Sequence, residues 1–206
     1  MSSTGEDALL LEQWRAGDPK AGEALIERNF PRVKRFFRRK TSNRDVVQEL
    51  SQRTFIRCMD KIDAFEHRSS FSSFLYGIAR NILLEHYREQ RKADRGVSVE
   101  EVPAVDLEPS PFSIVERRSE RKLIIHVLRR LPLDTQILIE LYFFENLPGR
   151  QVSEVLELPE GTVRGRIRSC RGQVEKLVRQ LAESPEQLES TMMTLETWAR
   201  KVREKV

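Results

Sequence analysis

Apolar residues recur at three- and four-residue steps along most of the chain, which is the spacing of one face of an α-helix. In the first half, a short helix over 7–15 precedes three longer ones, and Asp18 followed by Pro19 starts the first of these. Ser42 or Asn43 can cap the next, and a loop over 63–70 precedes the last. The three apolar stripes are Leu25, Ile26, Phe30, Val33 and Phe37; Val46, Val47, Leu50, Phe55, Ile56 and Met59; and Phe71, Phe74, Leu75, Ile78, Ile82 and Leu83. These stripes predict one helical bundle.

A second helical unit is expected after residue 112, with helices ending at Pro132 and then over 134–145, 149–156 and 160–182. The stretch 96–111 between the two units has three prolines, four acids and no base, and it reads as an extended linker. No strand pattern is present. The predicted fold is therefore all-α, with two small helical domains (1–92 and 113–182), an acidic linker (93–112) and a C-terminal helical extension (183–206).

The extension begins near Pro185, and its apolar positions follow at alternating steps of four and three: Leu188, Met192, Leu195, Ala199 and Val202. Acids come early in it and bases late, which suits the helix dipole. We predict an amphipathic helix. It either packs on the preceding domain or receives a regulator, and both alternatives stay open at this stage.

The charge of the chain is segregated although its net value over 206 residues is only +4. Two stretches carry bases and no acid, one over 32–44 and one over 164–171. With the acidic linker between them, they indicate two modules that face polyanions. The alternative is that both stretches are ordinary solvated helix faces.

Several classes of protein are excluded by what the sequence lacks. No apolar run approaches the length of a membrane span, and the acidic start is unlike a secretory signal. The chain has only two cysteines and three histidines, scattered without metal-ligand spacing, and no paired carboxylates at useful spacing. We therefore expect a cytoplasmic protein that is not an enzyme, holds no metal or cofactor and has no membrane partner.

The strongest local motif lies over 149–171, where a short helix, a three-residue turn and a longer basic helix follow one another. This is the pattern of a helix-turn-helix, whose second helix enters the DNA major groove. Arg164, Arg168 and Arg171 share one face of the second helix, and Thr162 near its start can cap it. The alternative is a basic surface helix on a helical hairpin. Gly165 inside this helix either permits close approach to DNA or is merely tolerated.

Two sets of residues resemble one known family, in that family's order. Leu131–Pro132, Leu141, Leu147, Val152 and PEGTVR (159–164) look like region 4 of sigma-70-type transcription initiation factors, specifically of the extracytoplasmic-function (ECF) branch. ELSQRTF (49–55) and DAFEHRSSFSSFLYGIARN (63–81) look like region 2 of the same family. The resemblance covers roughly residues 18–92 and 115–178.

The resemblance implies an alternative sigma factor that binds core RNA polymerase and directs promoter-specific initiation, helping to melt the −10 region. It assigns −35 recognition to Thr162, Arg164, Arg166, Arg168 and Arg171, and contact with single-stranded −10 DNA to Phe65, Arg80, Asn81 and Arg88. Docking on the clamp coiled coil of the largest polymerase subunit falls to Glu49, Leu50, Gln52, Arg53 and Phe55, with Arg53 at a position where the family commonly has an acid. Implied partners are core polymerase and promoter DNA, with an anti-sigma factor or other regulator as a further candidate.

Alternatives remain for several of these residues. At least one of Leu50 and Phe55 is expected to fill the bundle core, and Phe65 is either an exposed stacking surface or a core aromatic at a helix end. The linker either threads toward the polymerase cleft or is a plain tether. For the whole chain, the rival classes are a helix-turn-helix regulator outside the sigma family, a nucleic-acid enzyme and a protein-interaction module.

Overall fold

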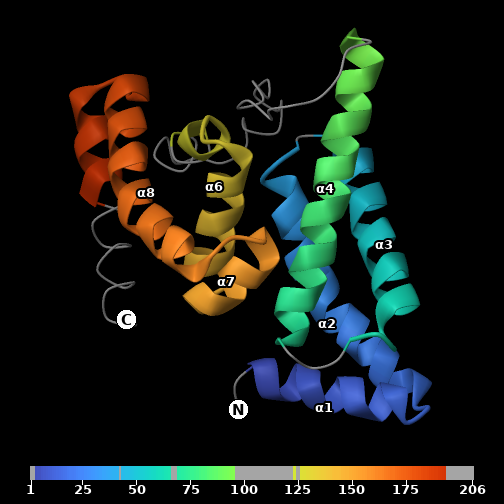
Figure 1. The fold of residues 1–206 in the computed structure, drawn as a ribbon. Helices are drawn as coiled ribbons and strands as arrows, with labels where there is room; N and C mark the ends of the chain where they lie inside the picture. Colours follow the sequence, from blue (N-terminus) through green and yellow to red (C-terminus); the bar gives the residue numbers. More distant parts are fainter. Residues whose placement is uncertain (1–2, 42, 66–68, 96–122, 124–125, 194–206) are drawn as a thin grey trace. The chain divides into compact units, whose positions relative to one another are not determined.

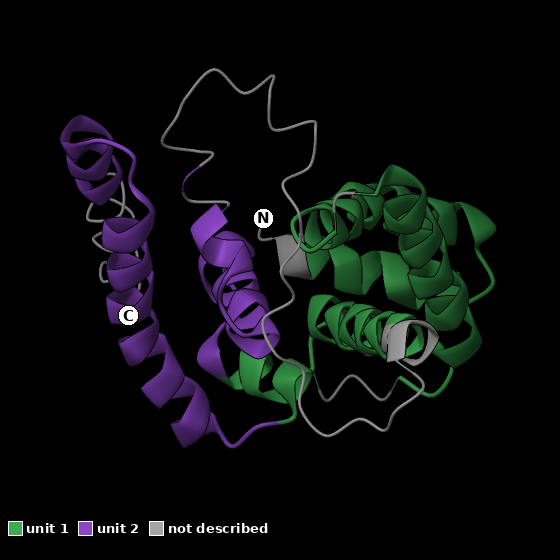
Figure 2. Ribbon diagram, turned by 90° about the horizontal axis from the view of Figure 1, so that it is seen from above, with its two compact units in different colours: residues 1–100, 150–157 green, residues 101–149, 158–206 purple. Residues whose placement is uncertain are grey.

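The computed structural model describes residues 3–41, 43–65, 69–95, 123 and 126–193. Most of the predicted linker and the end of the predicted extension lie outside these residues. Contacts between Cα atoms divide the chain into two compact units, 1–100 with 150–157 and 101–149 with 158–206 (Figure 2). The sequence-based boundaries at 92, 112 and 182 stay predictions. The described residues form helices and connecting turns without a strand, so the all-α expectation is confirmed.

The first unit contains four helices in the predicted order: α1 (Ser3–Arg15), α2 (Pro19–Arg38), α3 (Arg44–Lys61) and α4 (Phe71–Arg95). Helices α2, α3 and α4 run side by side, and α1 crosses near their end (Figure 1). The side chain of Asp18 caps α2 by accepting the amide of Lys20, as expected. Of the two candidate caps for α3, Asn43 accepts the amides of Asp45 and Val46.

The core of this unit follows the predicted stripes with one systematic difference. Two residues assigned to the stripe of α3 are exposed, Ile56 at 55 % and Met59 at 42 %. The buried positions of α3 are spaced three and four residues apart. An α-helix rotates by 100° per residue, so only one strip of its surface can face α2 and α4. The buried positions are Val47, Leu50, Ser51, Thr54, Phe55 and Cys58.

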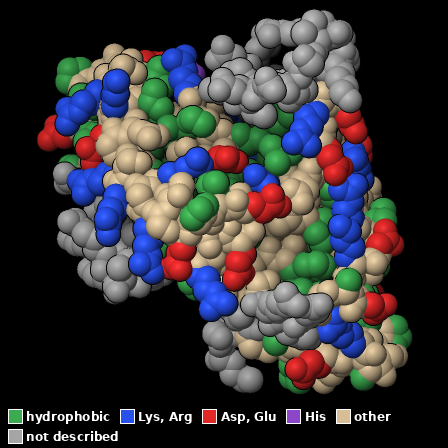
Figure 3. Space-filling view, viewed as in Figure 1, with side chains coloured by type: hydrophobic (Ala, Val, Ile, Leu, Met, Phe, Trp, Pro, Cys, Tyr) green, Lys and Arg blue, Asp and Glu red, His purple; other side chains and the backbone are tan. Residues whose placement is uncertain are grey.

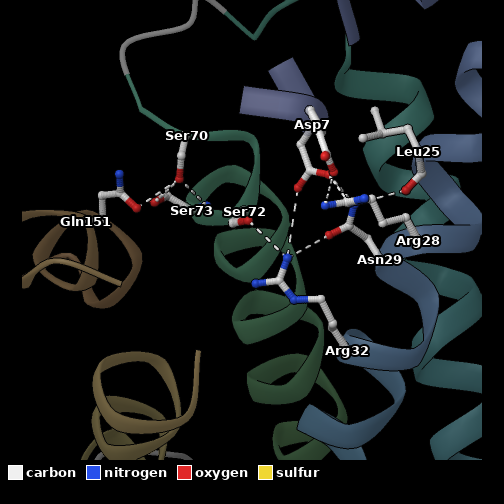
Figure 4. Close-up of polar contacts among 10 residues, drawn as sticks. Asp7, Leu25, Arg28, Asn29, Arg32, Ser70, Ser72, Ser73 and Gln151 are labelled. Carbon is white, nitrogen blue, oxygen red and sulfur yellow. Dashed lines mark hydrogen bonds and ion pairs between the residues drawn. The ribbon is translucent and has the colours of Figure 1, made fainter. Parts of the chain in front are cut away.

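A polar cluster ties α1 to its neighbours (Figure 4). The carboxylate of Asp7 is buried and lies 3.0 Å from the Nε atom of Arg28, and Asn29 Nδ2 donates to it at 3.4 Å. Arg32 donates to Asn29 Oδ1 at 3.1 Å and to Ser72 Oγ on α4 at 3.5 Å. Burial raises the pKa of Asp7 above its ordinary value, although hydrogen bonding to Asn29 and the two guanidinium groups oppose that rise.

The basic stretch 32–44 does not form one uniform surface. Arg32 points into the polar cluster around Asp7, and Lys40 is buried with its ammonium group 3.8 Å from the centre of the Phe36 ring. The ammonium group also donates to the Phe36 carbonyl at 3.1 Å. The exposed bases of this stretch are Lys34, Arg35, Arg38 and Arg44. Part of the charge that the sequence assigned to a polyanion-facing surface therefore stabilises the bundle.

The second half of the chain contains α6 (Leu133–Ile139), η2 (Glu140–Phe144), α7 (Gly149–Leu156) and α8 (Glu160–Leu181). The sequence predicted one α-helix over 134–145, whereas its second half is the π-helix η2. There the Glu145 amide donates to the Glu140 carbonyl five residues back, at 3.0 Å. The turn that follows has Asn146 at a φ of 54°, a left-handed conformation that asparagine tolerates.

The beginning of the C-terminal extension is helical, as predicted, over 185–193. Ser184 Oγ accepts the Gln187 amide at 3.2 Å, and Gln187 Oε1 accepts the Glu183 amide at 2.8 Å, so the two ends of the first turn cap each other. In Figure 1 this helix folds back beside α8. Thr191 is buried and Met193 is exposed, which favours packing in cis for the described part of the extension.

The turn between α7 and α8 contains a residue in a conformation that favours glycine, Glu157 with a φ of 57°. We expect Glu157→Gly to raise the free energy of unfolding by about 1 kcal/mol, because a left-handed backbone costs a residue with a Cβ about that much. Glu154→Gly, inside α7, should lower it by about 1 kcal/mol. Urea denaturation of both variants measures the difference, and a loss of stability in Glu157→Gly would contradict the expectation.

Candidate nucleic-acid and polymerase interfaces

Helix α8 has the two-faced character that the helix-turn-helix pattern predicts. It begins at Glu160, and three residues separate it from the end of α7 at Leu156. The buried residues on one side of it are Val163, Cys170, Val174 and Val178. Another side carries Arg164, Arg168 and Arg171, all exposed, and Lys and Arg side chains follow the edge of the molecule where α8 lies (Figure 3).

The three arginines differ in their neighbours. Arg164 donates to Glu160 Oε1 at 2.7 Å, and Arg171 donates to Glu175 Oε1 at 2.5 Å, each one turn away along the helix. These exposed pairs hold the guanidinium groups loosely, because surface ion pairs contribute little stability. Arg168 is exposed and makes no ion pair within the described residues. All three are therefore available to a polyanion.

The other two residues assigned to −35 recognition, Thr162 and Arg166, also lie on α8. Arg166 is two positions from Arg164, which turns it about 200° away, and its guanidinium group lies 3.6 Å from Asp134 on α6. Thr162 does not cap α8, because the residue at the N-cap is Pro159 and no side chain caps there. Its amide instead donates to the Pro159 carbonyl at 2.9 Å. Arg166 thus lies on another side of α8 from the three arginines, and Thr162 is an exposed residue of the first turn that does not cap the helix.

Of the four residues assigned to −10 DNA, α4 carries three. Asn81 and Arg88 are exposed and lie seven residues apart, so they share a face. Arg80 is mostly covered, with its side chain 11 % exposed and 3.8 Å from Glu157, which belongs to the same compact unit. Nearby, the hydroxyl of Ser70 donates to Gln151 Oε1 at 2.9 Å (Figure 4).

Phe65 is not the exposed aromatic that one of the two alternatives required. It is only 6 % exposed, and its ring centre lies 4.7 Å from that of Phe74 on α4. The expectation of an exposed stacking surface is corrected accordingly. Phe65 follows a short turn after α3, which ends at Lys61, and its ring is buried because it packs against Phe74 in the first turn of α4.

The residues assigned to polymerase docking divide into two groups. Leu50 and Phe55 are buried, and the Phe55 ring lies 5.5 Å from that of Phe30, so both fill the core and neither can anchor an interface. Glu49 and Gln52 are exposed. The apolar residues that do face outward are Ile56 and Met59, which sequence reasoning had placed in the core. Their spacing from Gln52, four and seven residues, was the signal that could have identified them.

Arg53, the departure from the family pattern, has a structural partner. Its guanidinium group lies 3.5 Å from Glu49 and 3.5 Å from Glu85 of α4. Arg57 donates to the same Glu85 carboxylate at 2.7 Å, and this hydrogen bond lowers the pKa of Glu85. Two bases on α3 thus share one acid on α4.

Both cysteines are buried. Among the described residues, no group of three or more His, Cys, Asp or Glu side chains could hold a metal ion. Burial raises the pKa of Cys58 to about 12 and that of Cys170 to about 11. Because the thiolate is the reactive form, neither thiol should react with Ellman's reagent at pH 8 in the folded protein. Both should react once guanidinium chloride unfolds the chain. A fast-reacting thiol without denaturant would contradict the burial.

Comparison with known proteins identifies the family. The model of sigma-70 region 2 matches residues 25–93, and that of sigma-70 region 4 matches residues 121–169. ECF RNA polymerase sigma-E factors of Salmonella typhimurium and Escherichia coli are 26% identical over 189 residues, covering 88% of this chain and 98% of theirs. The chain belongs to the ECF branch of the sigma-70 family. As a sigma factor, it serves promoter-directed transcription initiation.

Two solved structures share the fold of this ECF sigma factor. One is the sigma factor RpoE in complex with the anti-sigma factor NepR from Bartonella quintana, with a TM-score of 0.60, 20% identity and coverage of 79% of this chain and 99% of that one. The other is CnrH in complex with the cytosolic domain of CnrY, with a TM-score of 0.64, 20% identity and coverage of 86% and 99%. Across the described part of the chain, no helix has the length and apolar character to cross a membrane.

Proposed function

We propose that this sigma factor divides promoter recognition between its two halves. Residues of α3 bind core RNA polymerase, residues of α4 and the preceding loop hold the −10 element as a single strand, and α8 reads the −35 element as duplex. The observation that carries the proposal is the exposed arginine face of α8, which is turned by roughly 100° from the buried apolar face of the same helix.

The −35 role is supported by the geometry of α8. Arg164, Arg168 and Arg171 project along about two turns of one face. A guanidinium group can bind a phosphate or make a bidentate contact with guanine in the major groove, and a helix fits that groove. Arg166 is turned about 200° from Arg164 toward Asp134, so it is not assigned to this face.

The −10 role rests on the exposed face of α4. Asn81 offers a donor and an acceptor to the edge of an extruded base, and Arg88 two turns later offers a positive charge to a phosphate. Phe65, buried against Phe74, supports the first turn of α4 rather than offering a free stacking surface. Melting costs about 1.4 kcal/mol per base-pair step, and binding of an extruded base offsets part of that cost.

The polymerase role is assigned to the exposed stripe of α3. Glu49, Gln52, Ile56 and Met59 follow one another at three- and four-residue steps and combine polar groups with apolar ones. Such a stripe suits packing against another helix, and the clamp coiled coil of the largest polymerase subunit is the partner that the family resemblance implies. The same resemblance, together with the two sigma–anti-sigma complexes of similar fold, supports an anti-sigma factor as a further partner.

Run-off transcription with core polymerase tests the proposal. The promoter is first mapped by sequencing run-off products made by the reconstituted holoenzyme on genomic DNA. We expect a product that requires both the −35 and the −10 segments of the mapped promoter. A folded protein that yields no promoter-dependent product would refute the proposal. Co-purification with core polymerase separates it from a helix-turn-helix regulator outside the sigma family, which has no use for the stripe of α3.

Two glycines inside α8 provide a matched pair for the DNA-facing surface. A Cβ atom added at Gly165 or at Gly172 would meet nothing within 4 Å in the free protein. Both Gly165→Ala and Gly172→Ala should therefore raise the free energy of unfolding by about 0.5–1 kcal/mol. Gly165 lies among the arginines near the start of α8, so we expect Gly165→Ala alone to weaken binding of −35 duplex DNA. Fluorescence anisotropy measures this, and equal affinities for the two variants would show that Gly165 is merely tolerated.

A further inference from the structure

Arg15, the last residue of α1, makes contacts that neither the sequence motifs nor the family matches assign. Its Nη2 atom donates to the main-chain carbonyls of both Ile62 and Phe65, about 50 residues further along the chain. The guanidinium carbon also lies 5.8 Å from the centre of the Phe65 ring, within the range of a cation–π contact. One side chain thus holds the main chain at both ends of the segment 62–65.

This segment is where α3 ends and the loop that precedes α4 begins. Ile62 is the C-cap of α3, and the chain turns through hydrogen bonds from the Ile62 amide to the Met59 carbonyl at 3.3 Å and from the Phe65 amide to the Ile62 carbonyl at 3.2 Å. The last carbonyls of a helix lack partners within it and carry partial negative charge. The Arg15 guanidinium group binds the Ile62 carbonyl at this helix end, and the Phe65 carbonyl beyond it, by charge-assisted hydrogen bonds, which are stronger than neutral ones.

Arg15 can act as a fixed support because α1 is itself firmly docked. A Cβ atom at Gly22 of α2 would lie 2.6 Å from the Nε1 atom of Trp14, so the two helices approach more closely there than any other residue would allow. At the other end of α1, Asp7 and Glu6 pair with Arg28. The side chain that holds the segment 62–65 therefore belongs to a helix that packs closely on α2.

We propose that Arg15 is a positioning residue for capture of the −10 base. By fixing the main chain at Ile62 and Phe65, it holds the buried Phe65 ring against Phe74, so α4, which carries Asn81, is already in place when a base binds. Phe74 and Asn81 lie two turns apart on α4. The inference rests on the −10 role proposed above. It gives α1, which precedes the matched region 25–93, a part in DNA recognition.

Binding of single-stranded DNA tests this role. The probe is a fluorescein-labelled oligonucleotide of about 12 nucleotides that carries the non-template −10 sequence of the mapped promoter, together with versions abasic at one position each. Wild-type protein should bind the intact probe more tightly than the version that lacks the captured base. Arg15→Ala should lower affinity for the intact probe about tenfold and leave affinity for that abasic version nearly unchanged. Arg15→Lys, which keeps a charged donor, should recover part of the discrimination.

Two controls separate positioning from general stability. Arg28→Ala removes the ion pairs that Arg28 of α2 makes with Glu6 and Asp7 of α1 without touching the segment 62–65, so it should lower the melting temperature and keep the base discrimination. In hydrogen–deuterium exchange, Arg15→Ala should speed exchange of the Phe65 amide about tenfold, because its turn loses its support. Affinity for −35 duplex DNA and for core polymerase should stay within about twofold of wild type.

The outcomes distinguish this inference from the function on which it rests. If wild-type protein binds the intact and abasic probes equally, the −10 role falls and the role of Arg15 falls with it. If wild-type protein discriminates and Arg15→Ala discriminates equally well, the inference alone is refuted. Equal loss of discrimination in Arg28→Ala would assign the effect to docking of α1 as a whole and would overturn the specific role of Arg15.

Discussion

Replacing Arg164, Arg168 and Arg171 together by alanine is expected to lower affinity for −35 duplex DNA by at least about 100-fold at moderate salt. Each guanidinium group that binds a phosphate or a guanine contributes about 1–3 kcal/mol, and all three are exposed on one face of α8. The logarithm of the binding constant should also fall less steeply with salt, by about 0.9 per lost phosphate contact. Fluorescence anisotropy of a duplex probe over a salt series measures both effects.

The matched control for this experiment is Arg166→Ala on the same helix. Arg166 pairs with Asp134 on the other side of α8, so its loss should leave −35 affinity within about threefold of wild type. The overall charge falls by one in the control and by three in the triple variant. Comparing Arg166→Ala with Arg168→Ala, which also removes one charge, therefore separates position from charge. Equal losses of affinity in these two single variants would contradict the assignment of the DNA face.

Leu50→Ala is expected to lower stability, whereas Ile56→Ala is expected to weaken polymerase binding. Leu50 is fully buried in the first unit, and removing its side chain should lower the free energy of unfolding by about 3 kcal/mol. Ile56 is largely exposed, so its replacement should change stability by less than about 0.5 kcal/mol. Because it lies at the centre of the proposed docking stripe, its loss should weaken core polymerase binding about tenfold.

Urea denaturation and a competition assay for core polymerase measure these two quantities. The competition is run at a temperature where both variants remain folded, so that a loss of binding cannot follow from unfolding. Polymerase affinity that falls with Leu50→Ala and not with Ile56→Ala would return the docking surface to the residues that the sequence motif named. Gln52→Ala, at an exposed position of the same stripe, provides a second test of the surface assigned from the structure.

The errors of the sequence-based site have one common origin. Leu50, Phe55 and Phe65 stand in a functional motif, and a motif does not say which of its members face solvent. Burial depends on how α3 packs between α2 and α4, a contact between segments far apart in the sequence. Ile56 and Met59 have the same chemistry as their buried neighbours, so hydrophobicity alone could not separate them. Periodicity located the helices, and packing decided which strip of each helix is buried.

Charged residues show the same limit in a different form. Lys40 and Arg32 belong to a basic stretch that looks uniform in the sequence, yet one is buried against Phe36 and the other joins a cluster around Asp7. Arg166 alternates with Arg164 and Arg168 along the chain, and the rotation of about 100° per residue in an α-helix turns it to another face. That last distinction was accessible from the sequence, because it depends only on spacing within one helix.

The amino-acid sequence by itself determined the helical class, most helix boundaries, the cap at Asp18 and the family, since these depend on local spacing and on residue identity. The tertiary structure alone decided which side chains are buried and which distant groups meet. The contact of Arg15 with the carbonyls of Ile62 and Phe65 is the clearest case, because no local pattern links residues so far apart in the chain. Local energies select the elements, whereas desolvation and close packing between elements select the surfaces that remain for function.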